Sequence, residues 1–155
     1  MRNPSSIGGT YAWVCVNLEG DEISTGHGYV TAPYLGLERV TNNLTELLAI
    51  VSALECVTDG WDGTVCTDSL VSLRRIDRPG DTKWNGIPDE LIARAIKQRE
   101  RLPSVTFVLC CGHPTRAELL AGRDERGYPA SRHNVRADAL CKGMAALVVD
   151  RCGIA

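Results

Sequence analysis

The chain lacks the features that mark membrane and secreted proteins. It has no run of eighteen or more apolar residues, which excludes an ordinary membrane-spanning helix. Its first six residues have no apolar core of a signal peptide. Its seven cysteines include no CxxC pair, and most lie in apolar stretches, where a thiol behaves as a small hydrophobic side chain. We therefore expect a soluble, cytoplasmic protein with reduced cysteines and no membrane contact.

The chain also lacks a strong charge of either sign, an internal repeat and a low-complexity tract. Its net charge of -2 gives no global basic surface, so contact with nucleic acid requires a local patch or bound cations. The charge neither supports nor excludes such a substrate. At 155 residues and 44% hydrophobic content, the sequence predicts one compact domain over residues 1–155, and we expect a monomer.

Hydrophobic periodicity predicts an α/β fold with a mixed sheet and helices packed on it. A β-hairpin is expected first, followed by two single strands and four helices. The strands are expected at 11–17, 22–31, 64–67 and 105–111, and the helices at about 44–58, 70–76, 88–101 and 135–149. The polar stretch 112–132 is longer than an ordinary connection, which indicates a functional or mobile loop.

Three acidic residues stand near the expected ends of these elements. Glu46 lies at the start of a helix, Asp68 follows the strand at 64–67, and Asp138 lies near the start of the last helix. Magnesium takes hard oxygen ligands and keeps open positions for water and phosphate. Three carboxylates from distant parts of the chain therefore predict a magnesium-dependent phosphodiesterase site.

Each acid also has a structural alternative. Asn43 and Glu46 have the spacing of a capping box. Asp68 could cap the helix that follows it, and Asp138 could stabilise the positive end of the last helix. Helix capping explains any one acid as well as a metal site does, but the set favours the metal site.

The motifs around these acids resemble those of the ribonuclease H type 1 family. They read Thr-Asn-Asn-x-x-Glu-Leu at 41–47, Thr-Asp-Ser at 67–69, Cys-Gly-His at 111–113 and Asn-x-x-Ala-Asp-x-Leu at 134–140. The resemblance begins at Asn3-Pro4 and Gly8-Gly9, which are similar to the family's glycine-rich first turn, and covers nearly the whole chain. It implies a ribonuclease H-like mixed β-sheet flanked by α-helices.

On the matching positions, the resemblance implies that Glu46, Asp68 and Asp138 hold two magnesium ions, for which manganese substitutes. It implies that His113 assists proton transfer or product departure, although His133 competes for this role and a lone histidine after a strand is often an ordinary loop residue. The substrate-binding residues that it implies are Asn3, Asn42, Asn43, Ser69 and Asn134. The asparagines at 42 and 43 would contact RNA, and helix capping is compatible with this role.

The activity that the resemblance implies is endonucleolytic hydrolysis of the RNA strand of RNA–DNA hybrids by a two-metal mechanism. Two alternatives stay open: a non-catalytic module of the same fold that binds nucleic acid or protein, and a related nuclease acting on structured DNA. A zinc site formed by Cys110, Cys111, His113 and His133 is disfavoured. Adjacent strand residues point to opposite faces, so the two cysteines are expected to pack on two covered faces.

The chain departs from the family at its start. The family's first catalytic aspartate lies at the end of a first strand, before the residues that match Asn3-Pro4, and this chain begins after it. Because that strand is the middle of the family's sheet, we expect the hairpin to be separated from the strands at 64–67 and 105–111. Either the natural protein begins upstream of Met1, another segment fills the gap, or the chain is an inactive truncated relative. We favour the first explanation, which an in-frame stop codon close upstream would remove.

The sequence also predicts a weak grip on substrate. A modest positive cluster is formed by Arg74, Arg75, Arg78 and Lys83, with Trp84 beside it to stack or pack. A cluster of this size is usually a solvated face. We therefore expect weak, salt-dependent affinity for the hybrid.

Overall fold

The computed structural model describes residues 8–32 and 36–152, so the predicted substrate-binding residue Asn3 lies outside the described residues. The elements follow the predicted α/β order, with one short helix added. They are β1 (Gly8–Val16), β2 (Glu22–Thr31), α1 (Asn42–Glu55), β3 (Thr64–Thr67), α2 (Leu70–Asp77), the 3-10 turn η1 (Pro79–Asp81), α3 (Asp89–Arg101), β4 (Thr106–Leu109), α4 (Arg116–Ala121) and α5 (Arg132–Cys152). None of the described helices is long and apolar enough to cross a membrane.

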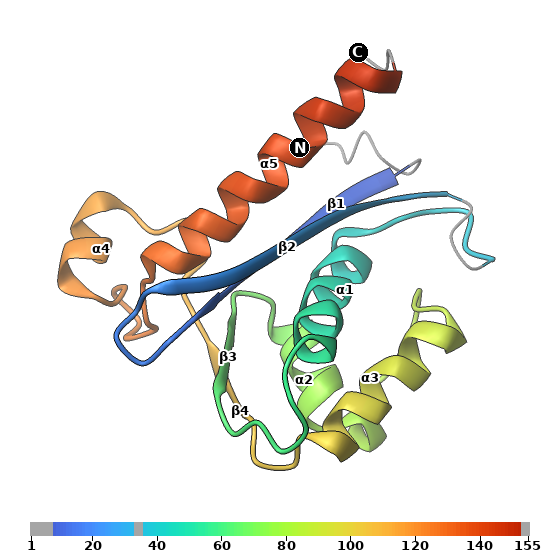
Figure 1. The fold of residues 1–155 in the computed structure, drawn as a ribbon, viewed down its shortest axis with the longest axis horizontal. Helices are drawn as coiled ribbons and strands as arrows, with labels where there is room; N and C mark the ends of the chain where they lie inside the picture. The colour runs from blue at the N-terminus through green and yellow to red at the C-terminus, as the bar shows by residue number, and fades with distance from the viewer. Residues whose placement is uncertain (1–7, 33–35, 153–155) are drawn as a thin grey trace.

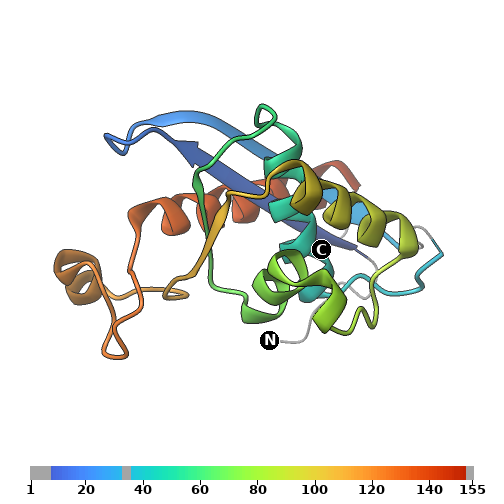
Figure 2. The ribbon, with the colours of Figure 1, turned by 90° about the horizontal axis from the view of Figure 1, so that it is seen from below.

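The described strands form two separate two-stranded sheets. β1 and β2 pair antiparallel, with Gly8 opposite Thr31. β3 and β4 pair parallel, with Thr64 opposite Thr106, and lie side by side in Figures 1 and 2. Within the described part of the chain no ladder joins β1 to β3, so the expected separation of the hairpin from the other strands is confirmed.

The hairpin lies between α1 and α5 (Figure 1). A Cβ on Gly9 would come within 2.8 Å of Cγ2 of Thr45 on α1, so the helix approaches closely only because glycine has no side chain. On the next residue, the Thr10 hydroxyl oxygen lies 3.0 Å from the sulfur of Cys141 on α5. Because successive strand residues point to opposite faces, the two helices cover opposite faces of β1.

One apolar core lies against both sheets and is built around α1. Leu44, Leu47 and Val51 of this helix are fully buried, with 0% exposure. The cluster also includes buried side chains from the rest of α1, from β2, α2 and α3, and from the segments that connect these elements. These are Val30, Val40, Leu48, Ile50, Leu54, Ile76, Ile87, Leu91, Ala95, Leu102 and Val105. Since truncating a fully buried leucine to alanine costs about 2–5 kcal/mol, the core holds α1, and with it Glu46, in a fixed position.

The sequence placed Arg75 on a solvated face, and this prediction is wrong, because the residue is only 5% exposed. Its Nε and Nη2 donate to the carbonyl oxygens of Lys83 and Asn85, at 3.0 and 3.3 Å. Its guanidinium carbon lies 5.9 Å from the centre of the Trp84 ring, whose Nε1 donates to the Pro79 carbonyl at 3.1 Å. Burial lowers the pKa of Arg75. Arg75 and Trp84 therefore join α2 to the following loop. The positive cluster predicted around Arg74 has one surface charge fewer, because the Arg75 guanidinium is buried.

The stretch 112–132 is not an unstructured loop, because it contains α4 and a tight turn closed by a bridge between Arg123 and Pro129. Figures 1 and 2 show α4 set apart from the other helices, beyond the N-terminal end of α5. The last helix begins at Arg132 rather than near Val135.

Candidate functional site

The start of α1 leaves Glu46 free of a capping role. The cap is Thr41, whose hydroxyl accepts the backbone N–H of Leu44 at 3.2 Å. A capping box needs its acid three residues after the cap, where this helix has Leu44. The capping-box interpretation of Asn43 and Glu46 is therefore wrong, and the first turn of α1 contains no acid.

The other two acids do not cap helices either. Ser69 caps α2, since its hydroxyl accepts the backbone N–H of Ser72 at 3.2 Å, and Asp68 stands before this cap in an exposed position. The first turn of α5 contains no acid, so Asp138 lies beyond the region where the helix dipole acts most strongly. The structural alternatives considered for the three acids are thus excluded.

Glu46 lies beside Asp68 and Ser69 at the junction of β3 and α2. Burial raises the pKa of Glu46, a hydrogen bond with the Ser69 side chain lowers it, and repulsion from Asp68 raises it, with a net upward shift. The Ser69 hydroxyl also donates to the Ser72 hydroxyl oxygen at 3.0 Å, which holds the Ser69 side chain at the start of α2. The fold therefore brings together two acids that are 22 residues apart in the sequence, between positions 46 and 68.

The segment after β4 lies close to Asp68. A Cβ on Gly112 would lie 2.8 Å from Oδ2 of Asp68, so a larger residue here would displace the carboxylate. His113 follows in an exposed position with φ of 50°, a left-handed conformation that is uncommon for a residue with a side chain. Such a conformation costs about 1–2 kcal/mol and persists where the surrounding structure enforces it.

Helix α5 reaches this segment through Asn134, whose Nδ2 donates to the carbonyl oxygen of Cys111 at 3.4 Å. Residues four apart share one helix face, so Asp138 lies one turn beyond Asn134. The Asp138 carboxylate pairs with Lys142 at 2.9 Å, and its side chain is 39% exposed. The spacing of this pair was readable in the sequence, although only the acid was singled out.

The described residues contain no group of three histidine, cysteine, aspartate or glutamate side chains that could hold a metal ion. Glu46 and Asp68 form the close pair, and Asp138 stands on α5 with a lysine partner. The two other predicted positions near Glu46, Asn42 and Asn43, are exposed on the first turn of α1, one turn before it.

The two candidate histidines occupy different places. His133 is half-buried, and its Nε2 lies 3.8 Å from the position of a Cβ on Gly20, in the turn between β1 and β2. Its backbone N–H donates to the Ser131 hydroxyl at 3.1 Å. His113 instead follows Gly112, whose backbone is so close to the Asp68 carboxylate that a Cβ would not fit between them. The geometry therefore favours His113 as the histidine next to the acid pair.

The cysteines before His113 have structural surroundings. Cys110 and Cys111 are 3% and 5% exposed, so their expected burial is confirmed. They do not belong to the strand as expected, because β4 ends at Leu109. The Cys111 thiol donates to Oε2 of Glu118 at 3.2 Å, and this hydrogen bond, together with burial, raises the pKa of Cys111 to about 11. A protonated thiol is a poor zinc ligand, which agrees with the low weight given to a zinc site.

No protein-family model and no curated protein sequence matches the chain. Solved structures are similar to it. RNase H1 from the halophilic archaeon Halobacterium salinarum NRC-1 is 25% identical over 86% of this chain and 82% of its own, with a TM-score of 0.51. LC11-RNase H1, isolated from compost by a metagenomic approach, is 21% identical over 88% of this chain and 92% of its own, with a TM-score of 0.55.

A second structure of LC11-RNase H1, in complex with an RNA/DNA hybrid, is 21% identical over 88% of this chain and 94% of its own, with a TM-score of 0.53. The chain therefore has a ribonuclease H-like fold, as the sequence motifs implied.

Proposed function

We propose that the chain is a metal-dependent endonuclease that hydrolyses the RNA strand of RNA–DNA hybrids. The observation that carries the proposal is the contact of Glu46 with Ser69 and Asp68 at the β3–α2 junction of a ribonuclease H-like fold. These acids lie in the motifs that resemble the ribonuclease H type 1 family. One protein of similar structure was solved with an RNA/DNA hybrid bound.

The acid pair fits a hard divalent cation in charge and in chemistry. Burial is the main cause of the raised pKa of Glu46, and repulsion from Asp68 adds to it. A cation bound between the two carboxylates would remove this repulsion. Glu46 and Asp68 would hold magnesium or manganese. Asp138 is the proposed third carboxylate, and it would leave its ion pair with Lys142 to bind the metal. Two such ions, when bound, supply an activated water and charge stabilisation at the scissile phosphate.

The other residues of the site bind, position or move protons. Asn42 and Asn43 present exposed amides one turn from Glu46, where they can recognise the ribose 2′-hydroxyl that distinguishes RNA from DNA. Ser69 holds the Glu46 carboxylate, and Asn134 holds the segment after β4 through the Cys111 carbonyl oxygen, so we propose that both position the site. The imidazole of His113 is exposed, and we propose that it assists proton transfer or product departure.

The proposal is tested with end-labelled RNA in an RNA–DNA hybrid, in duplex RNA and in single strands, beside duplex and branched DNA. With magnesium or manganese, we expect cuts in the RNA of the hybrid that leave 5′-phosphate and 3′-hydroxyl ends, and none with a chelator. Cleavage of branched DNA alone would show instead a nuclease for structured DNA. Binding of the hybrid without any cleavage would contradict the enzymatic proposal.

A non-catalytic binding module is the second candidate. It is favoured by the Asp138–Lys142 pair and by the lack, among the described residues, of a group of three possible metal ligands. Thermal unfolding with and without magnesium separates the two functions. Metal binding to the folded enzyme raises the melting temperature, whereas the module should not respond.

Replacing His113 is expected to slow turnover by about a hundredfold or less, the lower range for loss of a proton-transfer group. Glycine tolerates the left-handed backbone at this position, whereas alanine is strained there. If the loss of the imidazole causes the slower turnover, His113→Ala and His113→Gly should therefore slow turnover equally. His133→Ala, on α5 with its side chain near the hairpin turn, is the control and should keep nearly full turnover. Single-turnover rates measure these effects, and a slow His133→Ala with a normal His113→Ala would reverse the assignment.

A further inference from the structure

The segment 115–131, called the α4 arm below, is a rigid structure rather than a loose connection. Thr115 caps α4 by accepting the backbone N–H of Glu118 at 3.2 Å, and Gly122 ends the helix with φ of 78°. In the turn that follows, the Asp124 carboxylate accepts the backbone N–H groups of Arg126 and Tyr128 at 2.9 and 3.0 Å. The arm thus presents its surface side chains at little cost in conformational entropy.

The arm is anchored at the candidate site. The backbone N–H of Cys111 donates to the carbonyl oxygen of Pro129 at 2.8 Å, and its thiol donates to the Glu118 carboxylate at 3.2 Å. Cys111 directly precedes Gly112, where a Cβ would lie 2.8 Å from Oδ2 of Asp68. Two contacts at one residue therefore fix the arm relative to the acid pair.

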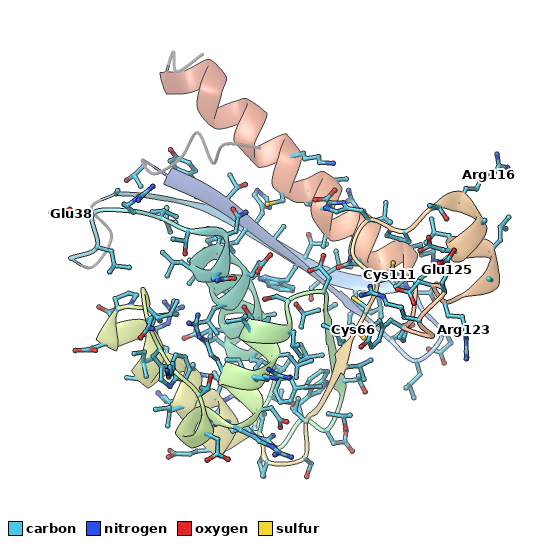
Figure 3. All side chains as sticks on the ribbon, turned by 180° about the vertical axis from the view of Figure 1, so that it is seen from behind. Glu38, Cys66, Cys111, Arg116, Arg123 and Glu125 are labelled. Carbon is cyan, nitrogen blue, oxygen red and sulfur yellow. The ribbon has the colours of Figure 1, made fainter. Side chains whose placement is uncertain are left out.

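Most acids of the arm form contacts with nearby residues, whereas its arginines face solvent. Glu118 accepts a hydrogen bond from the Cys111 thiol, and the Asp124 side chain is 7% exposed and forms an ion pair with Arg126. Arg116 and Arg123 are exposed, and their side chains have no hydrogen bond or ion pair among the described residues. Figure 3 shows both at the outer side of the arm, at the opposite end of the molecule from Glu38.

The arm and the start of α5 also differ in charge from the chain as a whole. Between positions 115 and 136 the sequence has five arginines and three acids, while the entire chain has a net charge of -2. The exposed acid of the arm is Glu125. A chain without global positive charge needs a local patch to hold a polyanion. The α4 arm supplies such a patch on a segment that is anchored next to the acid pair.

We propose that the α4 arm is a backbone clamp for nucleic acid, in which Arg116 and Arg123 bind phosphates of the strand that lies across Glu46 and Asp68. This inference rests on the proposed function for its substrate. The planar guanidinium groups match phosphate oxygens in pairs, and their contacts carry affinity without base specificity. The clamp would supply the electrostatic affinity for the hybrid that the cluster around Arg75 does not provide.

The test measures binding of a fluorescently labelled hybrid to the full chain by anisotropy, in a chelator so that no cleavage occurs. The double variant Arg116→Ala/Arg123→Ala should bind about tenfold more weakly at low salt. The slope of log Kd against log salt should fall by about two, one unit for each lost phosphate contact. Since neither side chain has a partner among the described residues, thermal unfolding should not change.

Two controls separate the clamp from general charge and from a protein interface. Arg39→Ala removes an exposed arginine next to Glu38, at the other end of the molecule, and should leave affinity and slope unchanged. Leu120→Ala removes the arm's 82% exposed leucine and should also leave them unchanged. Unaltered binding by the double variant would overturn the clamp, as would a larger loss from Leu120→Ala, which would indicate an apolar protein interface.

The clamp and the proposed function can fail separately. Arginine-dependent binding of a hybrid that is never cut with magnesium would retain the clamp and reject the nuclease. Cleavage with the affinity and salt dependence of the double variant unchanged would retain the nuclease and reject the clamp. If both hold, the double variant should raise KM for the hybrid and leave kcat nearly unchanged.

Discussion

Asp68→Asn is expected to reduce hydrolysis of the RNA–DNA hybrid by at least about a thousandfold, equal to about 4 kcal/mol of transition-state stabilisation. The carboxylate stands beside Glu46 at the candidate site, and an amide of the same shape binds a divalent cation far more weakly. The variant should keep its fold, because Ser69 rather than Asp68 caps α2.

The stability of Asp68→Asn should be unchanged or slightly higher without metal, since the substitution removes a charge that repels Glu46. Initial rates with magnesium and urea unfolding without it measure the two effects. Asp62→Asn, which neutralises an exposed aspartate in the segment just before β3, is the matched control and should be normal in both. Undiminished turnover by Asp68→Asn would reject the assigned site.

Glu46→Gln is expected to abolish activity and to change how stability depends on pH. In the folded chain the pKa of Glu46 is raised, chiefly by burial. A carboxyl group with a raised pKa destabilises the folded state once it ionises, so its favourable contribution is present below the unfolded pKa and is lost as pH rises through the folded pKa. Without metal, wild-type stability should fall relative to the variant over this window.

The measurement is the free energy of unfolding of both proteins in urea, from about pH 4 to pH 7. The variant should gain on the wild type as pH rises, and magnesium should reverse the order by stabilising the wild type more. Glu38→Gln, at an exposed position, is the control that shows no such crossing. A difference between Glu46→Gln and wild type that does not vary with pH or magnesium would contradict the expectation.

The regular elements were predictable because their periodicity is local. The strand at 64–67 matches β3 to the residue, and the helix from Leu70 differs only at its last residue. The start of α1 was misplaced because Thr41, Asn42 and Asn43 can all cap a helix, and only the contact of Thr41 with Leu44 identifies the cap. Helix α4 escaped prediction because six residues in a polar stretch do not establish a period.

The candidate site was predictable as a set of residues but not as a geometry. The motifs identified Glu46, Asp68 and Asp138, yet which acids meet depends on how α1, β3 and α5 pack. Burial of Arg75 escaped prediction for the same reason. Its partners are backbone carbonyls and the Trp84 ring, and a sequence does not show when such groups surround a charge.

The division of the strands into two sheets has a consequence for local opening of the molecule. A two-stranded hairpin is at best marginally stable alone, so β1 and β2 take their order from α1 and α5. The β3–β4 pair draws instead on the core around α1, α2 and α3. Loosening α5 would therefore release the hairpin while β3 and β4 stay folded. Backbone amides of the two sheets should exchange with solvent as two cooperative units, with the hairpin opening at the lower free energy.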